Sequence, residues 1–193
     1  SIWFIVNPIS GKSKKKNLKK QIEKYLDHSK YDFEFIFSSH AGNLTELAQE
    51  AIDKNINILC VAGGDGSVRE AGKVLKGTDT ILSIIPVGSG NGFARHFKIP
   101  LKVKNAISII NNGKPIKVDT GLINEHVFLA FAGIAFDAKI ANLYEGSKRR
   151  GFYRYAWLIL QHYFFYKPIF IKGENIDEKK LMICSVKNIS EFG

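Results

Sequence analysis

Segments with the composition of buried strands alternate with segments of helical periodicity through residues 2–113 of this 193-residue chain. The strand-like segments are residues 2–7, 31–39, 56–62 and 80–88. Helical patterns follow them at residues 18–26, 42–55, 67–77 and 89–97, with a further helix at 104–113. Four such alternations predict an α/β fold with a mainly parallel sheet. Right-handed crossovers place the strand-to-helix loops along one edge of such a sheet, where ligands bind.

Local signals refine two of these elements. Phe33, Phe35 and Phe37 alternate with other residues, which predicts a strand that buries one face. Asn43 is followed three residues later by Glu46, and this capping-box spacing predicts that Asn43 is the N-cap of its helix.

The alternation stops after residue 115, where the pattern becomes that of β-structure. The predicted elements are a strand at residues 115–123, a turn at Asn124 and Glu125, and strands at residues 126–136 and 179–188. The chain is therefore expected to hold an α/β domain of residues 1–115 and a β-rich domain of residues 116–193. A hairpin, a helix and one strand make a poor independent sheet, so we expect the second domain to continue past Gly193.

A basic, aromatic segment, residues 148–168, lies within the second domain. Apolar side chains recur in it at helical spacing, at Phe152, Tyr155, Ala156, Ile159, Leu160 and Tyr163. Such a stripe either packs against a core or forms an interfacial helix. In the second case, anionic lipid would meet the neighbouring cations Lys148, Arg149, Arg150 and Arg154.

The formal net charge of +10 favours an anionic partner such as a phosphate ligand, acidic lipid or nucleic acid, although it also serves solubility alone. Nucleic acid is not expected, because the sequence has no RRM, KH or helix-turn-helix signature. Cys60 and Cys184 lie in apolar runs and suggest neither a disulfide framework nor a zinc site, which favours a reducing cytosol. The longest apolar run, residues 127–136, is too short to cross a bilayer.

Residues 61–72, VAGGDGSVREAG, lead from an apolar strand directly into three glycines around one aspartate. Gly63 and Gly64 allow a ligand to approach the backbone closely, and the helix expected from Ser67 offers N–H donors for an anion. Asp65 cannot itself favour a phosphate, so we expect it to bind ribose, orient a loop or hold Mg²⁺ through water. A plain structural turn is the alternative.

Two further loops of small, hydrogen-bonding residues leave other predicted strands. The first strand leads into NPISGK and the fourth into PVGSGNGFAR. Three such loops at successive strand ends suit a nucleotide threaded between them. None of the loops is a Walker P-loop, which requires GxxxxGK[ST].

The combination of NPxSG, GGDGS followed by Glu70, and PxGSGNxFAR resembles the diacylglycerol kinase catalytic-domain family, which includes bacterial lipid kinases, sphingosine kinases and ceramide kinases. The resemblance covers residues 3–135, with the motifs in the family's order and spacing. It implies a fold like that of NAD kinase and diacylglycerol kinase, ATP and Mg²⁺ as cofactors, and phosphoryl transfer to a lipid hydroxyl. It also implies a cytoplasmic enzyme in peripheral contact with a membrane, while homodimer formation stays open.

The resemblance assigns roles to individual residues. Its nucleotide-binding positions are Asn7, Pro8, Ile9, Ser10, Gly11, Ser38, Gly63, Gly64, Asp65, Gly66, Ser67, Glu70, Ser89 and Asn91. Asp65 and Glu70 are the catalytic candidates, with Asp65 positioning nucleotide and metal rather than acting as a base. Asp119 matches an aspartate of a water-linked magnesium network. Lys12 and Arg95 match basic positions that favour the lipid or its phosphate. A structural salt bridge for Glu70 and a solvated helix charge for Arg95 are the simpler alternatives.

The sequence departs from the family at two positions of these motifs. Arg69 stands where the family often has Asn, and Gly92 where bacterial members often have Asp. The Ser-Gly-Asn form is similar to that of sphingosine and ceramide kinases, so the lipid substrate stays open. The family's proposed general base lies in a later part of the second domain, and no residue of this sequence is assigned to that role. The alternatives are a GGDG kinase with a soluble substrate, such as NAD kinase, and a non-catalytic anion-binding module.

Overall fold

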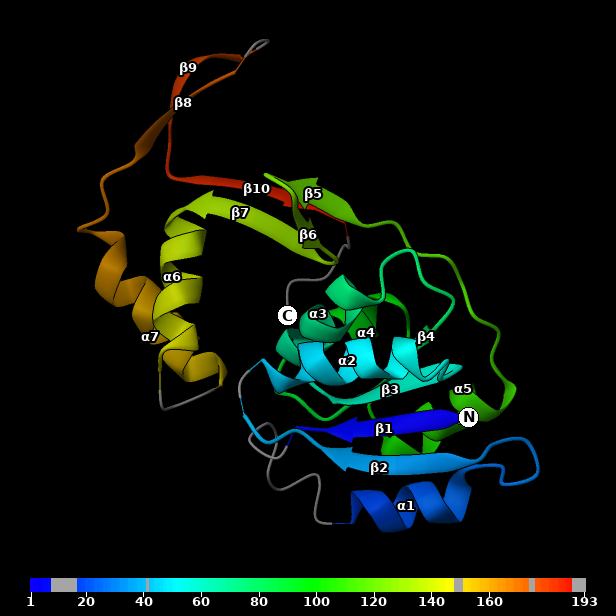
Figure 1. The fold of residues 1–193 in the computed structure, drawn as a ribbon. Helices are drawn as coiled ribbons and strands as arrows, with labels where there is room; N and C mark the ends of the chain where they lie inside the picture. The colour runs from blue at the N-terminus through cyan, green and yellow to red at the C-terminus, as the bar shows by residue number, and fades with distance from the viewer. Residues whose placement is uncertain (8–16, 41, 148–150, 174–175, 189–193) are drawn as a thin grey trace. The chain divides into compact units, whose positions relative to one another are not determined.

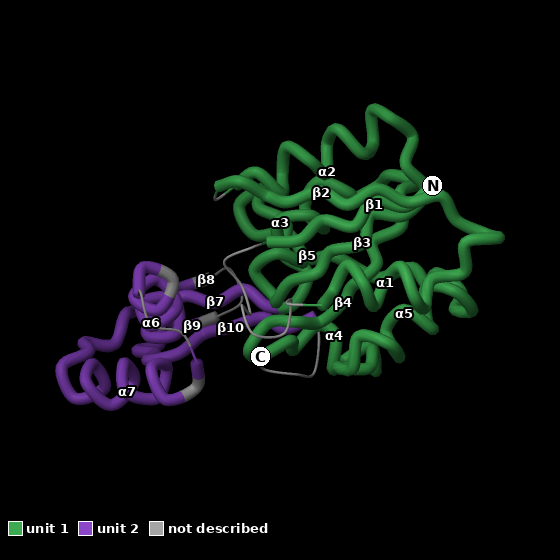
Figure 2. The backbone as a smooth tube through the Cα atoms, turned by 90° about the horizontal axis from the view of Figure 1, so that it is seen from below, with its two compact units in different colours: residues 1–130, 189–193 green, residues 131–188 purple. Residues whose placement is uncertain are grey.

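The computed structural model describes residues 1–7, 17–40, 42–147, 151–173 and 176–188. The chain divides into two compact units, with residues 1–130 in unit 1 and residues 131–188 in unit 2, which Figure 2 shows in different colours. The functional domain boundary expected between residues 115 and 116 stays a prediction.

Unit 1 is built on a four-stranded sheet in the order β2-β1-β3-β4, and all of its strand pairs are parallel (Figure 1). The strands are β1 (Ile2–Val6), β2 (Phe33–Phe37), β3 (Ile58–Gly63) and β4 (Ile81–Pro86). Val6 is level with Phe37 and Ala62, and Gly63 is level with Pro86, so all four strands end at one edge. The α/β class and the parallel sheet predicted from the sequence are confirmed.

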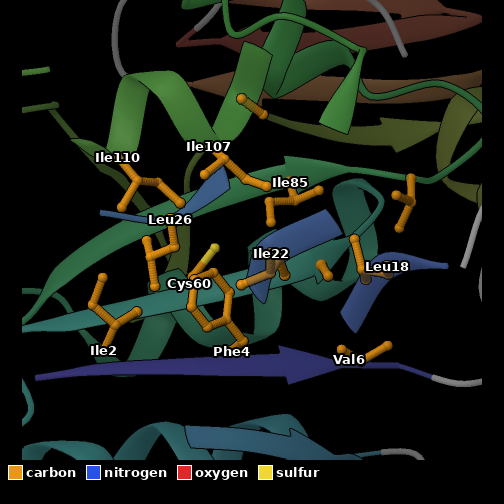
Figure 3. Close-up of a cluster of buried hydrophobic side chains, with 13 residues drawn as sticks. Ile2, Phe4, Val6, Leu18, Ile22, Leu26, Cys60, Ile85, Ile107 and Ile110 are labelled. Carbon is orange, nitrogen blue, oxygen red and sulfur yellow. The ribbon is translucent and has the colours of Figure 1, made fainter. Parts of the chain in front are cut away.

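Helices cover both faces of this sheet. They are α1 (Leu18–Tyr25), α2 (Asn43–Asp53), α3 (Asp65–Val74), the short α4 (Gly92–His96) and α5 (Val103–Asn112). Ile2 and Phe4 of β1 pack with α1 and α5, as Figure 3 shows, whereas Trp3 and Ile5 pack with α2 and α3. Burial on both faces explains why β1 is an uninterrupted apolar run, as is usual for central strands of parallel sheets.

Unit 1 ends in a short antiparallel hairpin of β5 (Gly121–Ile123) and β6 (His126–Phe128). Asn124 and Glu125 join its strands with φ values of 45° and 65°. Positive φ at both central residues is the signature of a type I′ turn, whose twist suits a two-residue hairpin. The turn predicted at these two residues is therefore confirmed.

Unit 2 combines two antiparallel strand pairs with two helices. Its elements are β7 (Phe131–Ala135), α6 (Phe136–Glu145), α7 (Phe152–Tyr163), β8 (Ile169–Gly173), β9 (Ile176–Leu181) and β10 (Ile183–Lys187). β7 pairs with β10 and β8 pairs with β9. The core of the unit is formed by Phe136 and Ile140 of α6 with Leu158 of α7. In the part of the chain that the structure describes, no helix has the length and apolar character to cross a membrane.

Three expectations about these elements were wrong. Helix α6 was not predicted, because residues 126–136 had been interpreted as one strand, whereas β6 and β7 divide that segment and α6 begins at Phe136. The strand expected at residues 179–188 is interrupted at Met182 between β9 and β10. Phe37 was expected on the buried face of β2, but its side chain is 61% exposed.

The predicted N-cap at Asn43 was also wrong. Gly42 occupies the N-cap position of α2 with a left-handed φ of 85°, and Asn43 is the first helical residue. The Asn43 side chain accepts a hydrogen bond from the Ser39 backbone N–H at 3.0 Å and donates to a Glu46 carboxylate oxygen at 2.7 Å. Asn43 therefore organises the loop that precedes α2 instead of capping the helix.

Candidate functional site

The loops of the predicted site begin side by side at the carboxyl edge of the unit 1 sheet. In the spatial order of the strands, the residues that follow them are Ser38, Asn7, Gly64 and Val87. The backbone N–H of Ser38 donates to the Val6 carbonyl at 3.1 Å. The N–H groups of Val87 and Gly88 donate to the Gly63 carbonyl at 3.1 and 3.2 Å. These bonds extend the strand pairing into the loops and hold neighbouring loops together.

Gly64 and Gly88 bring the loops after β3 and β4 into direct backbone contact. A Cβ atom on Gly64 would lie 3.1 Å from the Gly88 Cα. A Cβ atom on Gly88 would overlap the Gly64 Cα and lie 2.8 Å from Asn91 Oδ1. Gly88 therefore has no room for a side chain without movement of a loop, and a Cβ on Gly64 would make a contact tighter than ordinary van der Waals distance. By contrast, a Cβ on Gly66 would meet no atom within 4 Å.

The Asn91 side chain holds the loop after β4 through two hydrogen bonds to the Gly88 backbone. Its side chain is 3% exposed and its backbone is left-handed, with a φ of 58°. Its Oδ1 accepts a hydrogen bond from the Gly88 N–H at 3.0 Å, and its Nδ2 donates to the Gly88 carbonyl at 2.9 Å. Asparagine is among the few residues that tolerate this backbone region, and both ends of its amide are used here.

Asp65 joins the loops after β3 and β4 through its side chain. It lies half-buried in the first turn of α3, and its Oδ1 accepts a hydrogen bond at 3.0 Å from the backbone N–H of Phe93 in α4. The positive ends of both helices favour a carboxylate there. This contact matches the loop-orienting role among those considered for Asp65. Within the described part of the chain, its Oδ2 accepts no hydrogen bond.

The first turn of α3 carries the other residues of the GGDGS motif. The helix begins at Asp65, two residues earlier than the start expected at Ser67. The Ser67 side chain is buried, and a Cβ on Gly63 would lie 2.6 Å from the Ser67 Cβ, so this side chain packs beneath the loop. The Ser67 hydroxyl is therefore buried, and the backbone N–H of Ser67 lies in the first turn of α3. N–H groups in a first helical turn have no partner within the helix.

Glu70 does not share a helix face with Asp65. It follows Asp65 by five residues, which corresponds to about 140° around α3, and it is half-buried in the second turn. Arg69, which is exposed, follows Asp65 by four residues and lies on the same face. The catalytic role predicted for Glu70 stays a prediction.

The remaining predicted residues have varied surroundings. Arg95 is exposed and its Nε donates to the Gly90 carbonyl at 3.1 Å, which holds the guanidinium against the loop after β4. Ser89 of that loop is exposed, Ser38 is 4% exposed, and Asp119 is an exposed residue between α5 and β5. The predicted site residues Pro8, Ile9, Ser10, Gly11 and Lys12 lie outside the described residues.

The described His, Cys, Asp and Glu side chains do not form a metal site made of protein ligands alone. Among the described residues, no three His, Cys, Asp or Glu side chains form a group that could hold a metal ion. Mg²⁺ usually keeps several waters and binds one or two carboxylates together with substrate phosphates. Asp65 and Asp119 each carry a carboxylate of the kind that such a shell uses, and their metal roles stay predictions.

Two groups important to this geometry were absent from the predicted site. They are Gly88, whose lack of a side chain permits the loop crossing, and the Phe93 N–H, which binds Asp65. The sequence signal for the first was a glycine two residues after the end of β4, near the level of the GGDGS loop. The second is a backbone group and leaves no signature in the sequence.

Comparison with known proteins agrees with this geometry. The family described as "Diacylglycerol kinase catalytic domain" matches residues 1–123. A diacylglycerol kinase of Staphylococcus aureus is 34% identical over 132 residues, covering 67% of this chain and 42% of the relative. A diacylglycerol kinase of Staphylococcus saprophyticus is 31% identical over 131 residues, covering 67% of this chain and 43% of the relative.

The fold is also that of a solved relative. The crystal structure of a diacylglycerol kinase from Bacillus anthracis superposes with a TM-score of 0.71 at 24% identity, covering 100% of this chain and 64% of that one. The chain thus spans less than half the length of the two curated staphylococcal relatives. The family match, the fold and the three loops at one sheet edge agree with the resemblance drawn from the motifs, and the chain belongs to the diacylglycerol kinase catalytic-domain family.

Proposed function

We propose that this chain is the nucleotide-binding part of a kinase that transfers the γ-phosphoryl group of ATP to a lipid hydroxyl. The observation that carries the proposal is the crossing of Gly64 and Gly88 beside the open first turn of α3. The crossing fixes two loops through their backbones, and a Cβ built on Gly66 would meet no atom of the described residues within 4 Å. Membership of the family supplies the reaction class.

The phosphates of ATP would bind at the N-terminus of α3. The positive end of the helix dipole and the first-turn N–H groups of Gly66 and Ser67 favour a phosphate there. Gly66 is exposed and has no side chain, so a phosphate oxygen can reach the backbone. Asn7, Ser38 and Ser89, at the ends of β1, β2 and β4, would contribute further polar contacts.

Asp65 would act mainly by positioning. Phosphoryl transfer depends on alignment and on neutralising charge, and little covalent chemistry is required of the protein. Through Oδ1, Asp65 holds the loop after β4 against the phosphate-binding turn. Its Oδ2, with Asp119, would face a hydrated Mg²⁺, which when bound neutralises charge on the phosphate oxygens.

The acceptor is proposed to be a lipid of the diacylglycerol or sphingoid type. The names of the staphylococcal relatives favour diacylglycerol, whereas the Ser-Gly-Asn sequence of residues 89–91 favours a sphingoid base. Arg95 and Lys12 would attract the lipid or its phosphate product. A cytoplasmic protein in peripheral contact with a membrane follows from this choice of acceptor.

A phosphate-transfer assay tests the proposal. The full-length protein is incubated with labelled ATP, Mg²⁺ and a panel of diacylglycerols, sphingoid bases and ceramides. Asp65→Asn is assayed in parallel, and Asp79→Asn, which changes an exposed aspartate after α3, is the matched control. We expect a labelled lipid with the unmodified protein and with Asp79→Asn, and none with Asp65→Asn.

Two other outcomes would contradict the proposal in different ways. Binding of ATP without a labelled lipid, combined with labelling of a soluble acceptor such as NAD, would refute the lipid specificity. Absence of ATP binding would refute the nucleotide site itself.

A further inference from the structure

Arg69 of α3 lies on the part of the helix surface that borders the proposed phosphate-binding turn. It is exposed, and it follows Asp65 by four residues and Gly66 by three. Successive residues of an α-helix are about 100° apart, so Arg69 lies about 40° around the axis from Asp65 and about 60° from Gly66. Arg69 is therefore placed one turn after these two residues and between them around the helix.

This placement directs the Arg69 side chain over the first turn of α3. The Cα–Cβ bonds of an α-helix tilt toward its N-terminus, and a long side chain covers the surface over the preceding turn, which is about 5.4 Å long. A Cβ built on Gly66 would meet no atom of the described residues within 4 Å. The guanidinium of Arg69 can therefore reach an anion that is bound to the backbone of this turn.

Buried contacts fix the rotation of α3 about its axis. Val68, Ala71 and Gly72 are buried, and a Cβ on Gly72 would overlap the Leu129 side chain. Rotation of the helix would disturb this packing. Arg69 and Lys73, both exposed, therefore stay on the same side of α3 as Gly66.

The neighbouring Asp65 indicates which phosphate Arg69 would meet. Asp65 Oδ1 is bound by the Phe93 N–H, and Oδ2 is the atom proposed to face a hydrated Mg²⁺. In kinases the metal ion bridges oxygens of the β- and γ-phosphates. Because Arg69 shares a helix face with Asp65, its guanidinium belongs to the same end of the phosphate chain. An arginine can bind a phosphate there through two parallel N–H···O bonds.

We propose that Arg69 binds the γ-phosphoryl group of ATP during its transfer. In that step the bond from the γ-phosphorus to the bridging oxygen breaks, and ADP leaves with the electron pair. The acceptor oxygen bonds to the phosphorus, and its proton passes to water. Negative charge lies on the three equatorial oxygens during the transfer, and the guanidinium neutralises part of it. The inference rests on the proposed function, because it concerns the same nucleotide site.

Calorimetry of the full-length protein with Mg²⁺ and either ADP or a non-hydrolysable ATP analogue tests the contact with the third phosphate. Arg69→Gln removes the charge and keeps a good helix former. It should bind the ATP analogue about tenfold or more weakly and bind ADP as tightly as the unmodified protein, because the lost charge-assisted contact is made only to the γ-phosphate. Arg69→Lys should recover part of the affinity, since lysine keeps the charge without the planar fork.

Lys73→Gln is the matched control. It removes one positive charge from the same side of α3, one turn farther from the phosphate-binding turn, and should change neither affinity. In the transfer assay at saturating ATP, Arg69→Gln should lower kcat by about tenfold or more and leave the KM of the lipid acceptor unchanged. Urea unfolding without nucleotide should be the same for Arg69→Gln and the unmodified protein.

Three results would overturn the inference and leave the nucleotide site intact. One is an affinity for the ATP analogue and a kcat that Arg69→Gln changes no more than Lys73→Gln does. Another is an equal loss of affinity for ADP and for the ATP analogue together with lower stability, which would show a structural role. The third is a higher KM for the acceptor alone, which would place Arg69 at the lipid. If the unmodified protein bound neither nucleotide, the proposed function itself would be refuted.

Discussion

The crossing of the loops after β3 and β4 predicts opposite effects for two glycine-to-alanine substitutions. In Gly88→Ala, the new Cβ would overlap the Gly64 Cα and approach Asn91 Oδ1 to 2.8 Å. In Gly66→Ala, the new Cβ would meet no atom within 4 Å, and the position lies in the first turn of α3. The two substitutions add the same methyl group to neighbouring parts of one site.

The expected free energies follow from these contacts. Carbon atoms pack at about 3.5–4.0 Å, so one loop must move in Gly88→Ala, and overpacking of this kind costs about 1–3 kcal/mol. Displacement of Asn91 weakens its two hydrogen bonds to Gly88, at about 1 kcal/mol each. Gly88→Ala should therefore lower the free energy of unfolding by about 2–4 kcal/mol. Gly66→Ala should leave it unchanged or raise it by up to about 1 kcal/mol, because alanine favours helix more than glycine.

Urea unfolding without nucleotide and titration calorimetry with ATP and Mg²⁺ measure the two effects separately. Gly66→Ala should bind ATP about tenfold or more weakly, since its methyl group occupies the space that a phosphate needs to reach the backbone. If Gly88→Ala were as stable as the unmodified protein, the crossing would be looser than described. If Gly66→Ala bound ATP normally, the phosphates would not lie at this turn.

Three further predictions concern single side chains. Asp65→Asn keeps an oxygen that accepts from the Phe93 N–H, so it should keep the stability of the protein while losing turnover. Asp65→Ala should lose turnover and also about 1 kcal/mol of unfolding free energy. Urea titrations measure the stability, and the transfer assay measures the turnover. Asn91→Ala should lower the free energy of unfolding by about 2–3 kcal/mol, because it removes two buried hydrogen bonds and leaves at positive φ an alanine, whose side chain cannot hydrogen-bond to the backbone. Thermal unfolding measures this loss, and an unchanged stability would contradict the role of Asn91 in holding the loop after β4. Burial raises the pKa of the Cys60 thiol to about 12 from an ordinary 9.0. As the pH rises above 9, the thiol therefore loses its proton in the unfolded chain but keeps it in the folded protein. The free energy of unfolding should then fall by about 1.4 kcal/mol per pH unit above pH 9. The same pH series with Cys60→Ala should lack this component of the slope.

The α/β part of the fold could be predicted because its signals are local. The strands of unit 1 are apolar runs, and the helices between them have a regular apolar face, as Ile22 in α1 and Ala48 in α2 illustrate. The turn at Asn124 and Glu125 could be predicted for the same reason, since two residues between short strands favour one turn geometry.

Features that depend on contacts between distant segments could not be predicted. The capping-box spacing at Asn43 was misleading, because Ser39 and Glu46 both bind that side chain and Gly42 can adopt the left-handed N-cap. The stripe predicted in α7 also divides, since Tyr155 packs on α6 while Leu160 is 62% exposed. Helical periodicity identifies apolar faces but does not specify which face meets the core.

The sequence predicted the motifs of the candidate site, and the structure showed the contacts that hold these motifs together. The sequence showed that small residues follow three strands. It did not show that Gly88 contacts Gly64, or that Asp65 binds the Phe93 N–H. Both contacts join segments that are separate in the sequence, and the second involves only the backbone of α4.

A crystal structure of the protein with a non-hydrolysable ATP analogue and Mg²⁺ would test the central claim most directly. We expect phosphate oxygens within hydrogen-bonding distance of the Gly66 and Ser67 backbone N–H groups, with Asp65 still bound to the Phe93 N–H. An ordered nucleotide away from the carboxyl edge of the unit 1 sheet would contradict the proposed site.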